Sequence, residues 1–206
     1  MTKPWMMVML AALLGLTGCS NSEPTTDSPP PAEAPSVTGA VAGQALDARA
    51  AIVLLDHASF GSTKVAHLEI RIANDPAACA AAKQARDTVK PGTTLLTLGV
   101  MSFDGTIAPG TYPVSARDGS GGPPNAQTPP EANADFQAHG AQCEALATDS
   151  ATAGTITLES VEGGARGTFD VTFAGGKLTG RFDASLCIDG TASGPPSTNA
   201  GPTCSP

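Results

Sequence analysis

The sequence predicts an all-β domain, either an antiparallel β-sandwich or a small barrel of about seven to nine short strands. Apolar and polar residues alternate with a period of two in several runs, most clearly in Lys64–Ala73 and Gly154–Cys187. Turn residues separate these runs at short intervals, and only Ala77–Arg86 has strong helix propensity. We therefore expect a sheet protein with a C-terminal meander and at most one short helix.

The stretch Gly154–Cys187 predicts the meander, three strands joined by two tight turns. Its Gly-Gly pairs, Gly163-Gly164 and Gly175-Gly176, are typical of two-residue hairpin loops because glycine adopts positive φ at no steric cost. Both hairpins put the same face of the middle strand into the core. Counting outward from the loops places Leu158 opposite Phe169, Ile156 opposite Val171, Phe169 opposite Phe182, Phe173 opposite Leu178, and Asp170 opposite Arg181.

Strands are also expected before the meander. The continuous apolar run Ala50–Leu55, ended by Asp56, predicts a strand buried on both sides. In Lys64–Ala73, alternation predicts one buried and one solvated face. The inward residues would be Ala66, Leu68, Ile70 and Ile72, and the outward ones Val65, His67, Glu69 and Arg71. Further strands are expected over Thr93–Phe103, Thr111–Ala116 and Phe136–Thr148.

Three segments do not have the alternating pattern of a strand. Asp75 and Pro76 are plausible start signals for the short helix over Ala77–Arg86. The stretch Arg117–Asp135 has no aliphatic residue larger than alanine and is expected to be a flexible loop. The tail Asp189–Pro206 is rich in glycine, proline, serine and threonine and is also expected to be flexible.

The first residues have the pattern of an export signal. Lys3 supplies a positive charge, and Trp5–Leu16 is a run of twelve residues without a polar side chain, too short to span a bilayer. The next residues, Leu16-Thr17-Gly18-Cys19, resemble the lipobox of bacterial lipoproteins. That resemblance implies that Cys19 becomes the acylated (palmitate-bearing) N-terminus of the mature protein. The serine that follows it favours the outer membrane over the inner one.

The expected domain organisation follows from composition. Residues 1–18 would be the signal peptide, and residues 19–36 the lipidated cysteine with a disordered stalk rich in proline, serine and threonine. Residues 37–206 would form the all-β domain, with its flexible loop at 117–135 and its flexible tail at 189–206. The predicted location is the cell envelope, at the periplasmic or surface face of the outer membrane, with the lipid as the membrane contact.

Charge and cysteine content restrict the function. The chain has 11 Lys and Arg against 19 Asp and Glu, a net charge of −8, which argues against nucleic acid as a partner. After Cys19, four cysteines remain, and an even number in an exported chain predicts disulfides. Three pairings are possible; we favour Cys187–Cys204 and Cys79–Cys143. No C-x-x-C pair is present, which argues against a zinc knuckle or a redox site.

Candidates for catalysis are weak. His67 and Glu69 share a strand face and are weak metal candidates, but a third ligand, His57 or Asp56, has no fixed position. The carboxylates of the meander, Glu159, Glu162, Asp170 and Asp183, could suggest a glycosidase, although an ion pair between Asp170 and Arg181 is the simpler interpretation. No serine nucleophile elbow, H-E-x-x-H helix or phosphate loop is present. We expect no cofactor, no metal and no catalytic residue.

The meander is also loosely similar to small all-β domains of predicted lipoproteins of high-GC Gram-negative bacteria, through Gly167–Asp170 and Leu178–Cys187. That resemblance implies the fold and no particular activity. We therefore expect a membrane-anchored envelope lipoprotein that is a non-catalytic binding or structural module, with an envelope or extracellular protein or glycan as partner. The first alternative is a β-barrel that binds a small apolar or sugar ligand, and the second is a hydrolytic enzyme.

Overall fold

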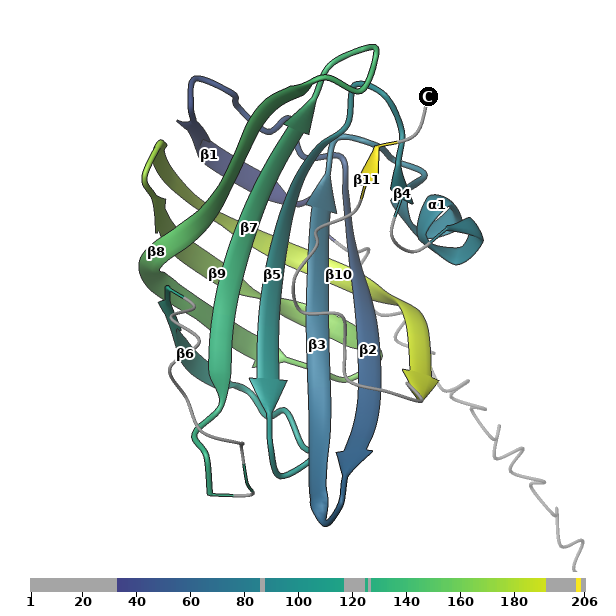
Figure 1. Ribbon diagram of the computed structural model, residues 1–206, viewed down its shortest axis with the longest axis vertical. Helices are drawn as coiled ribbons and strands as arrows, with labels where there is room; N and C mark the ends of the chain where they lie inside the picture. Colours follow the sequence, from purple (N-terminus) through teal and green to yellow (C-terminus); the bar gives the residue numbers. More distant parts are fainter. Residues whose placement is uncertain (1–32, 86–87, 117–124, 126, 192–202, 205–206) are drawn as a thin grey trace, which may run out of the picture. The chain divides into compact units, whose positions relative to one another are not determined.

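A computed structural model describes residues 33–85, 88–116, 125, 127–191 and 203–204 (Figure 1). Residues 32–206 form a compact unit of their own. The signal segment, Cys19 and most of the expected stalk lie outside the described residues. So do 117–124 and 126 of the expected loop and 192–202 and 205–206 of the expected tail.

Eleven strands and one helix make up the described part. The strands are β1 (Ser36–Val41), β2 (Ala50–Phe60), β3 (Thr63–Ala73), β4 (Thr88–Val89), β5 (Thr94–Ser102), β6 (Gly110–Ser115), β7 (Glu131–His139), β8 (Ala145–Ser160), β9 (Gly164–Phe173), β10 (Gly176–Thr191) and β11 (Thr203–Cys204), and the helix is α1 (Ala78–Gln84). Nine of the strands form one sheet, while β4 and β11 pair separately. The predicted all-β class with one short helix is confirmed.

The nine-stranded sheet closes on itself. Its order is β1-β10-β2-β3-β5-β7-β6-β8-β9, and β9 pairs back onto β10. The long strand β10 is the junction, because it pairs with β9 along one edge and with β1 and then β2 along the other. In Figure 1, β2, β3, β5 and β7 form one wall and β8, β9 and β10 the opposite wall. The result is a small barrel of mixed pairing, because β10 and β2 run parallel whereas an antiparallel arrangement was expected.

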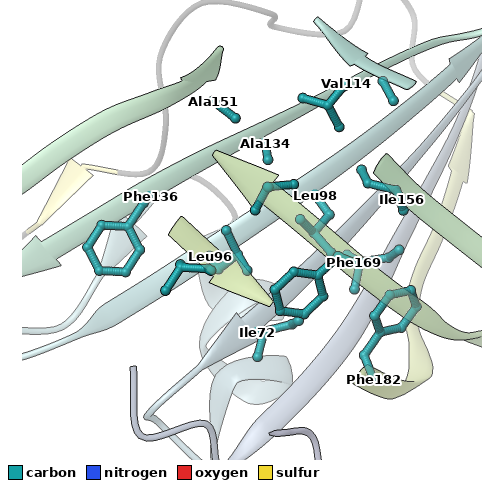
Figure 2. Packing of buried hydrophobic residues seen from close by; sticks show 14 of the residues in the cluster. Ile72, Leu96, Leu98, Val114, Ala134, Phe136, Ala151, Ile156, Phe169 and Phe182 are labelled. Atoms are coloured by element: carbon teal, nitrogen blue, oxygen red, sulfur yellow. The ribbon is translucent and has the colours of Figure 1, made fainter. Parts of the chain in front are cut away.

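The interior of the barrel is a packed aliphatic and aromatic core. Each long strand sends every second side chain inward, as the period of a strand requires, and these side chains form one continuous cluster. Phe136 is fully buried, and its ring meets that of Phe173 edge-to-face with centroids 6.3 Å apart. Figure 2 shows side chains of the two walls, among them Leu98, Phe136, Phe169 and Phe182, filling the same space.

The C-terminal meander is confirmed, but both of its predicted registers are wrong by two residues. Strand β9 pairs with β8 and with β10, and Phe169, Val171 and Phe173 are all buried as expected. A shift of two keeps every side chain on its face, so the core assignment survives the error. The observed pairs are Ile156 with Phe169, Leu158 with Gly167, Leu178 with Val171, Phe182 with Gly167, and Asp170 with Thr179.

The error arises because the second glycine of each Gly-Gly pair belongs to a strand. Gly164 begins β9 and Gly176 begins β10, so the second turn is Ala174-Gly175. At both glycines φ is positive, and a Cβ atom would lie about 2 Å from a backbone oxygen of the adjacent strand, that of Ala184 or Ala40. Glycine is therefore required there for close strand approach as much as for turning the chain.

Most of the other predicted elements lie close to their expected positions. The apolar segment of β2 is buried on both sides, since Val53 faces the core while Ile52 and Leu54 contact the α1 region. The strand does not end at Asp56, however, and continues to Phe60. The helix is confirmed at Ala78–Gln84, with Asp75 accepting a 2.8 Å hydrogen bond from the backbone N–H of Ala77.

The largest local correction concerns the expected loop over residues 117–135. Its last five residues begin strand β7, and the strand predicted over Phe136–Thr148 is two strands joined by a turn at residues 140–144. In β7, Ala132, Ala134, Phe136 and Ala138 are all buried against β5 and the opposite wall. Alanine supplies the inward face wherever larger side chains fill the space across it, so a criterion based on large aliphatic residues misses a true alternation.

Candidate functional site

All four cysteines of the domain form disulfides, as predicted, but the favoured pairing was wrong. Cys79 is bonded to Cys187, and Cys143 to Cys204. Helix α1 packs on β2 and β10, so Cys79 meets Cys187 beside Ile52, Leu54 and Ala82. The pairing of β11 with β4 brings Cys204 to the turn between β7 and β8. These contacts depend on tertiary structure, whereas the favoured pairing relied on the idea that Cys187–Cys204 fastens the C-terminal tail.

The candidate site residues His67 and Glu69 lie on the outer face of the wall formed by β2, β3, β5 and β7. Register places Asp56 directly opposite His67, and Glu69 in line with Gly99 and Asn133. The next row contains Arg71, Thr97, Asp135 and Ser150. This outer face was expected to be solvated, yet Asp56 and Arg71 are each only 6% exposed. We name Asp56, His67, Glu69, Arg71, Asn133 and Asp135 the polar face.

Hydrogen bonds link neighbouring members of the polar face. The Arg71 guanidinium donates through Nε to Glu69 Oε1, with both side chains largely buried. Asp135 accepts hydrogen bonds from Asn133 Nδ2 at 3.0 Å and from Ser150 Oγ at 2.6 Å. Gly99 leaves room for this network, since a Cβ atom there would lie 2.6 Å from Asn133 Oδ1. Arg71 and Glu69 therefore neutralise each other, and hydrogen bonds orient Asp135, as in a structural polar network.

The structure does not assemble a metal site from the predicted candidates. His67 and Glu69 share a face with Asp56, while His57 projects from the opposite side of β2. No group of three or more histidine, cysteine, aspartate or glutamate side chains in the described part of the chain could hold a metal ion. Arg71, bonded to Glu69, also supplies a positive charge where a cation would have to bind.

Two of the four candidate carboxylates of the meander, Glu159 and Asp170, take part in surface ion pairs. Asp170 pairs with Lys177 at 2.9 Å, not with Arg181, and Glu159 pairs with Arg166 at 3.4 Å. In each of these two pairs, both the acidic and the basic side chain are more than half exposed. Exposed pairs of this kind contribute little free energy. They do not form the partly enclosed pair of carboxyl groups that glycoside hydrolysis needs.

A small cavity lies outside the barrel, between α1, β4 and the ends of β3 and β5. Its volume is about 30 Å³, and its lining includes Arg71, Asp75, Ala82, Lys90 and Leu95. The Lys90 ammonium group is 3.2 Å from the Asp75 carboxylate, so the charges at its rim are paired. Space on this scale holds about two water molecules, whereas sites for small organic ligands measure some hundreds of Å³.

Sequence reasoning named His67 and Glu69 as candidates with Asp56 as a possible third ligand, placed Arg71 on the same face, and missed Asn133 and Asp135. The missed residues Asn133 and Asp135 fell within the expected loop, so they had no strand face to be assigned to. The available signal was the alternation of alanine with polar residues in Glu131–His139. Arg71 lies on a strand face that alternation assigns to solvent, and Asp56 was expected to end its strand, so the sequence predicts the burial of neither residue.

Replacing Arg71 by methionine should lower the free energy of unfolding by about 3 kcal/mol, because it leaves the Glu69 carboxylate buried without its cation. The Arg71 and Glu69 side chains are only 8% and 14% exposed. Arg181 offers the matched control, since its side chain is 59% exposed and pairs with Glu33. Arg181→Met should cost less than about 1 kcal/mol. Guanidinium unfolding measures both, and equal losses would contradict the difference in burial.

Residues at the end of β5 and in the turn after it lower the pKa of Asp104. Hydrogen bonds from the Ser102 hydroxyl, and from the backbone N–H and hydroxyl of Thr106, lower the pKa of Asp104 from 3.8 to about 2. The lowered pKa of Asp104 stabilises the fold at pH values above its ordinary pKa of 3.8, and that contribution is lost as the pH falls through about 2. Carboxyl ¹³C shifts should give Asp104 a midpoint near 2, and Ser102→Ala should raise it more than Thr106→Val does. An unchanged midpoint in Ser102→Ala would exclude the hydroxyl as the main cause.

In the described part of the chain, no helix is both long enough and apolar enough to cross a bilayer. Comparison of the chain with protein-family models, with curated proteins and with solved structures finds no match.

Proposed function

We propose that the protein is a lipid-anchored component of the cell envelope whose β-barrel is a non-catalytic binding or structural module. The lipobox-like sequence Leu16–Cys19 supports the anchor, and the polar stretch after it supports a spacer between lipid and barrel. The outer membrane is its proposed location, and another envelope or extracellular macromolecule, a protein or a glycan, its proposed partner.

The filled interior of the barrel is the observation that carries the second half of this proposal. Small barrels that bind ligands keep part of their interior open. Here side chains from both walls occupy that space, and Phe136, Ile156 and Leu178 are fully buried. A module built in this way contacts its partners through its outer surface. The small-ligand barrel therefore receives no support from the described interior.

The anchor is tested by lipid labelling of the full chain in a bacterial host. With radioactive palmitate in the medium, the wild-type protein should become labelled and Cys19→Ala should not. Ser20→Ala is the matched control, because it changes the neighbouring residue and keeps the cysteine, and it should be labelled like the wild type. Label on Cys19→Ala, or none on the wild type, would refute the lipid anchor.

The filled interior is tested with benzene and laurate as probes. Neither should bind the wild-type protein saturably in calorimetry or in NMR titration. Phe136→Ala is the matched variant, because it should open an apolar cavity that admits benzene. One-to-one binding of laurate to the wild type would contradict the proposal in favour of the small-ligand barrel.

A further inference from the structure

The two disulfides interleave along the chain. Cys79 is bonded to Cys187, 108 residues away, and Cys143 to Cys204, 61 residues away. In chain order the first cysteine of the domain is bonded to the third and the second to the fourth. No cysteine is bonded to its nearest neighbour in the sequence.

An unfolded chain favours a different pairing. The probability that two residues meet falls roughly as the 3/2 power of the loop length between them. Cys187 and Cys204 are only about 17 residues apart, and Cys79 and Cys143 about 64. While the chain is still unfolded, pairing of consecutive cysteines is therefore favoured roughly 15-fold over the native pairing.

The order in which the chain is synthesised also favours the pairing of consecutive cysteines. Chain synthesis presents Cys79 and Cys143 before Cys187 exists. Cys187 lies on β10, and in the native fold the pairing of β10 with β2 places it against Cys79. The thiols of Cys79 and Cys143, which are not native partners, are thus present before the thiol of Cys187. In an oxidising compartment they can react with each other.

We infer that this protein is a substrate of a thiol–disulfide isomerase, an enzyme that attacks disulfides with a reactive thiolate. Formation of each disulfide removes two electrons and two protons from a pair of thiols, which a disulfide oxidant accepts. The rearrangement of two consecutive disulfides into the native pair is redox-neutral. It needs a nucleophilic thiolate, which a fully oxidised chain cannot supply.

The exchange proceeds in three steps. The enzyme thiolate attacks Sγ of Cys187, forms a mixed disulfide with it and releases the Cys204 thiolate. That thiolate attacks Sγ of Cys143, forms the native Cys143–Cys204 bond and releases the Cys79 thiolate. The Cys79 thiolate then attacks the mixed disulfide, which forms Cys79–Cys187 and regenerates the enzyme thiolate.

Elements that carry the two disulfides both contact strand β4, and the fold buries Cys187. Cys79 lies on α1, which contacts both β10 and β4, and Cys204 on β11 pairs with β4. In the finished domain Cys187 is only 9% exposed. An attacking enzyme must therefore act before the barrel and α1 are fully packed, while Cys187 is still accessible.

The experiment uses the full chain with Cys19→Ser, so that only the four domain cysteines remain. The protein is oxidised in denaturant and then refolded in a glutathione buffer with or without protein disulfide isomerase. Species trapped with acid are mapped by peptide mass. Early species should carry Cys187–Cys204, and the isomerase should increase the rate of appearance of Cys79–Cys187 about tenfold.

The matched control also carries Cys143→Ser and Cys204→Ser, so that no wrong pairing exists in the chain. Oxidation in denaturant can form only Cys79–Cys187 in this chain, so the control should refold at nearly the same rate with and without the isomerase. An equal effect of the enzyme on both chains would overturn the inference, and so would no effect on the four-cysteine chain. For the four-cysteine chain, native pairs among the earliest trapped species, or their absence even with the isomerase, would overturn it as well.

Discussion

Replacement of Phe136 by alanine should lower the free energy of unfolding by about 3–5 kcal/mol. Phe136 is fully buried at the centre of β7, between strand β5 and the ring of Phe173 on the opposite wall. Its neighbours on the inward face of β7 are alanines, Ala134 and Ala138, whose short side chains cannot move into the vacated space. Most of the cavity should therefore persist, and its cost adds to the lost burial of the ring.

Two variants sharpen this measurement by chemical unfolding. Phe136→Leu should cost less than the alanine variant, because it refills part of the volume. Leu146→Ala removes a side chain that is 49% exposed on β8 and should change the stability by less than about 0.5 kcal/mol. If Phe136→Ala were no more harmful than Leu146→Ala, the barrel interior could not be packed as described.

Removal of the disulfide that ties α1 to β10, by Cys79→Ser with Cys187→Ser, should cost about 4–5 kcal/mol. The bond closes a loop of 108 residues, for which the loss of chain entropy predicts about 4.8 kcal/mol. It also holds α1 over Ile52 and Leu54 of β2, an apolar surface that would otherwise be open to water. The measurement is guanidinium unfolding of the purified, oxidised proteins.

The second disulfide supplies the comparison. Cys143–Cys204 closes 61 residues, and the same relation predicts about 4.3 kcal/mol for its removal by Cys143→Ser with Cys204→Ser. This bond fastens the two-residue strand β11, and both of its cysteines are partly exposed. The loss should therefore be the smaller of the two. A larger loss than for the Cys79–Cys187 bond would show that α1 contributes little to the packing of the barrel.

Local sequence patterns predicted much of the fold because a strand must present a face to the core. Alternation placed Leu68, Ile70 and Ile72 inward, and the meander kept Phe169 and Phe173 inward even though its register was off by two. A slip of two residues leaves the alternation unchanged, so the pattern cannot detect it. What separates the two registers is the close approach at Gly164 and Gly176, which involves atoms of a different strand.

The site was harder to predict than the fold, for a related reason. Arg71 is buried on a strand face that sequence alternation assigns to solvent, and Asp56 is buried within a strand that was expected to end there. The disulfide partners likewise depend on two events distant in the chain, the packing of α1 against β10 and the pairing of β11 with β4. Neither leaves a periodic trace in the sequence, and the expectation that Cys187–Cys204 fastens the C-terminal tail gave the wrong pairs.

The position of β10 also has a kinetic consequence. This last long strand of the chain completes the ring by pairing with β2, so residues 185–191 must find residues 52–57. Contacts across such long sequence separations make folding slow, because loop-closure entropy is lost before the contacts form. Until β10 binds, β2 and β9 each present an unpaired edge, the kind of surface through which partly folded sheets associate. A chain truncated before Gly176 would keep both edges exposed, and we expect it to aggregate rather than form a smaller barrel.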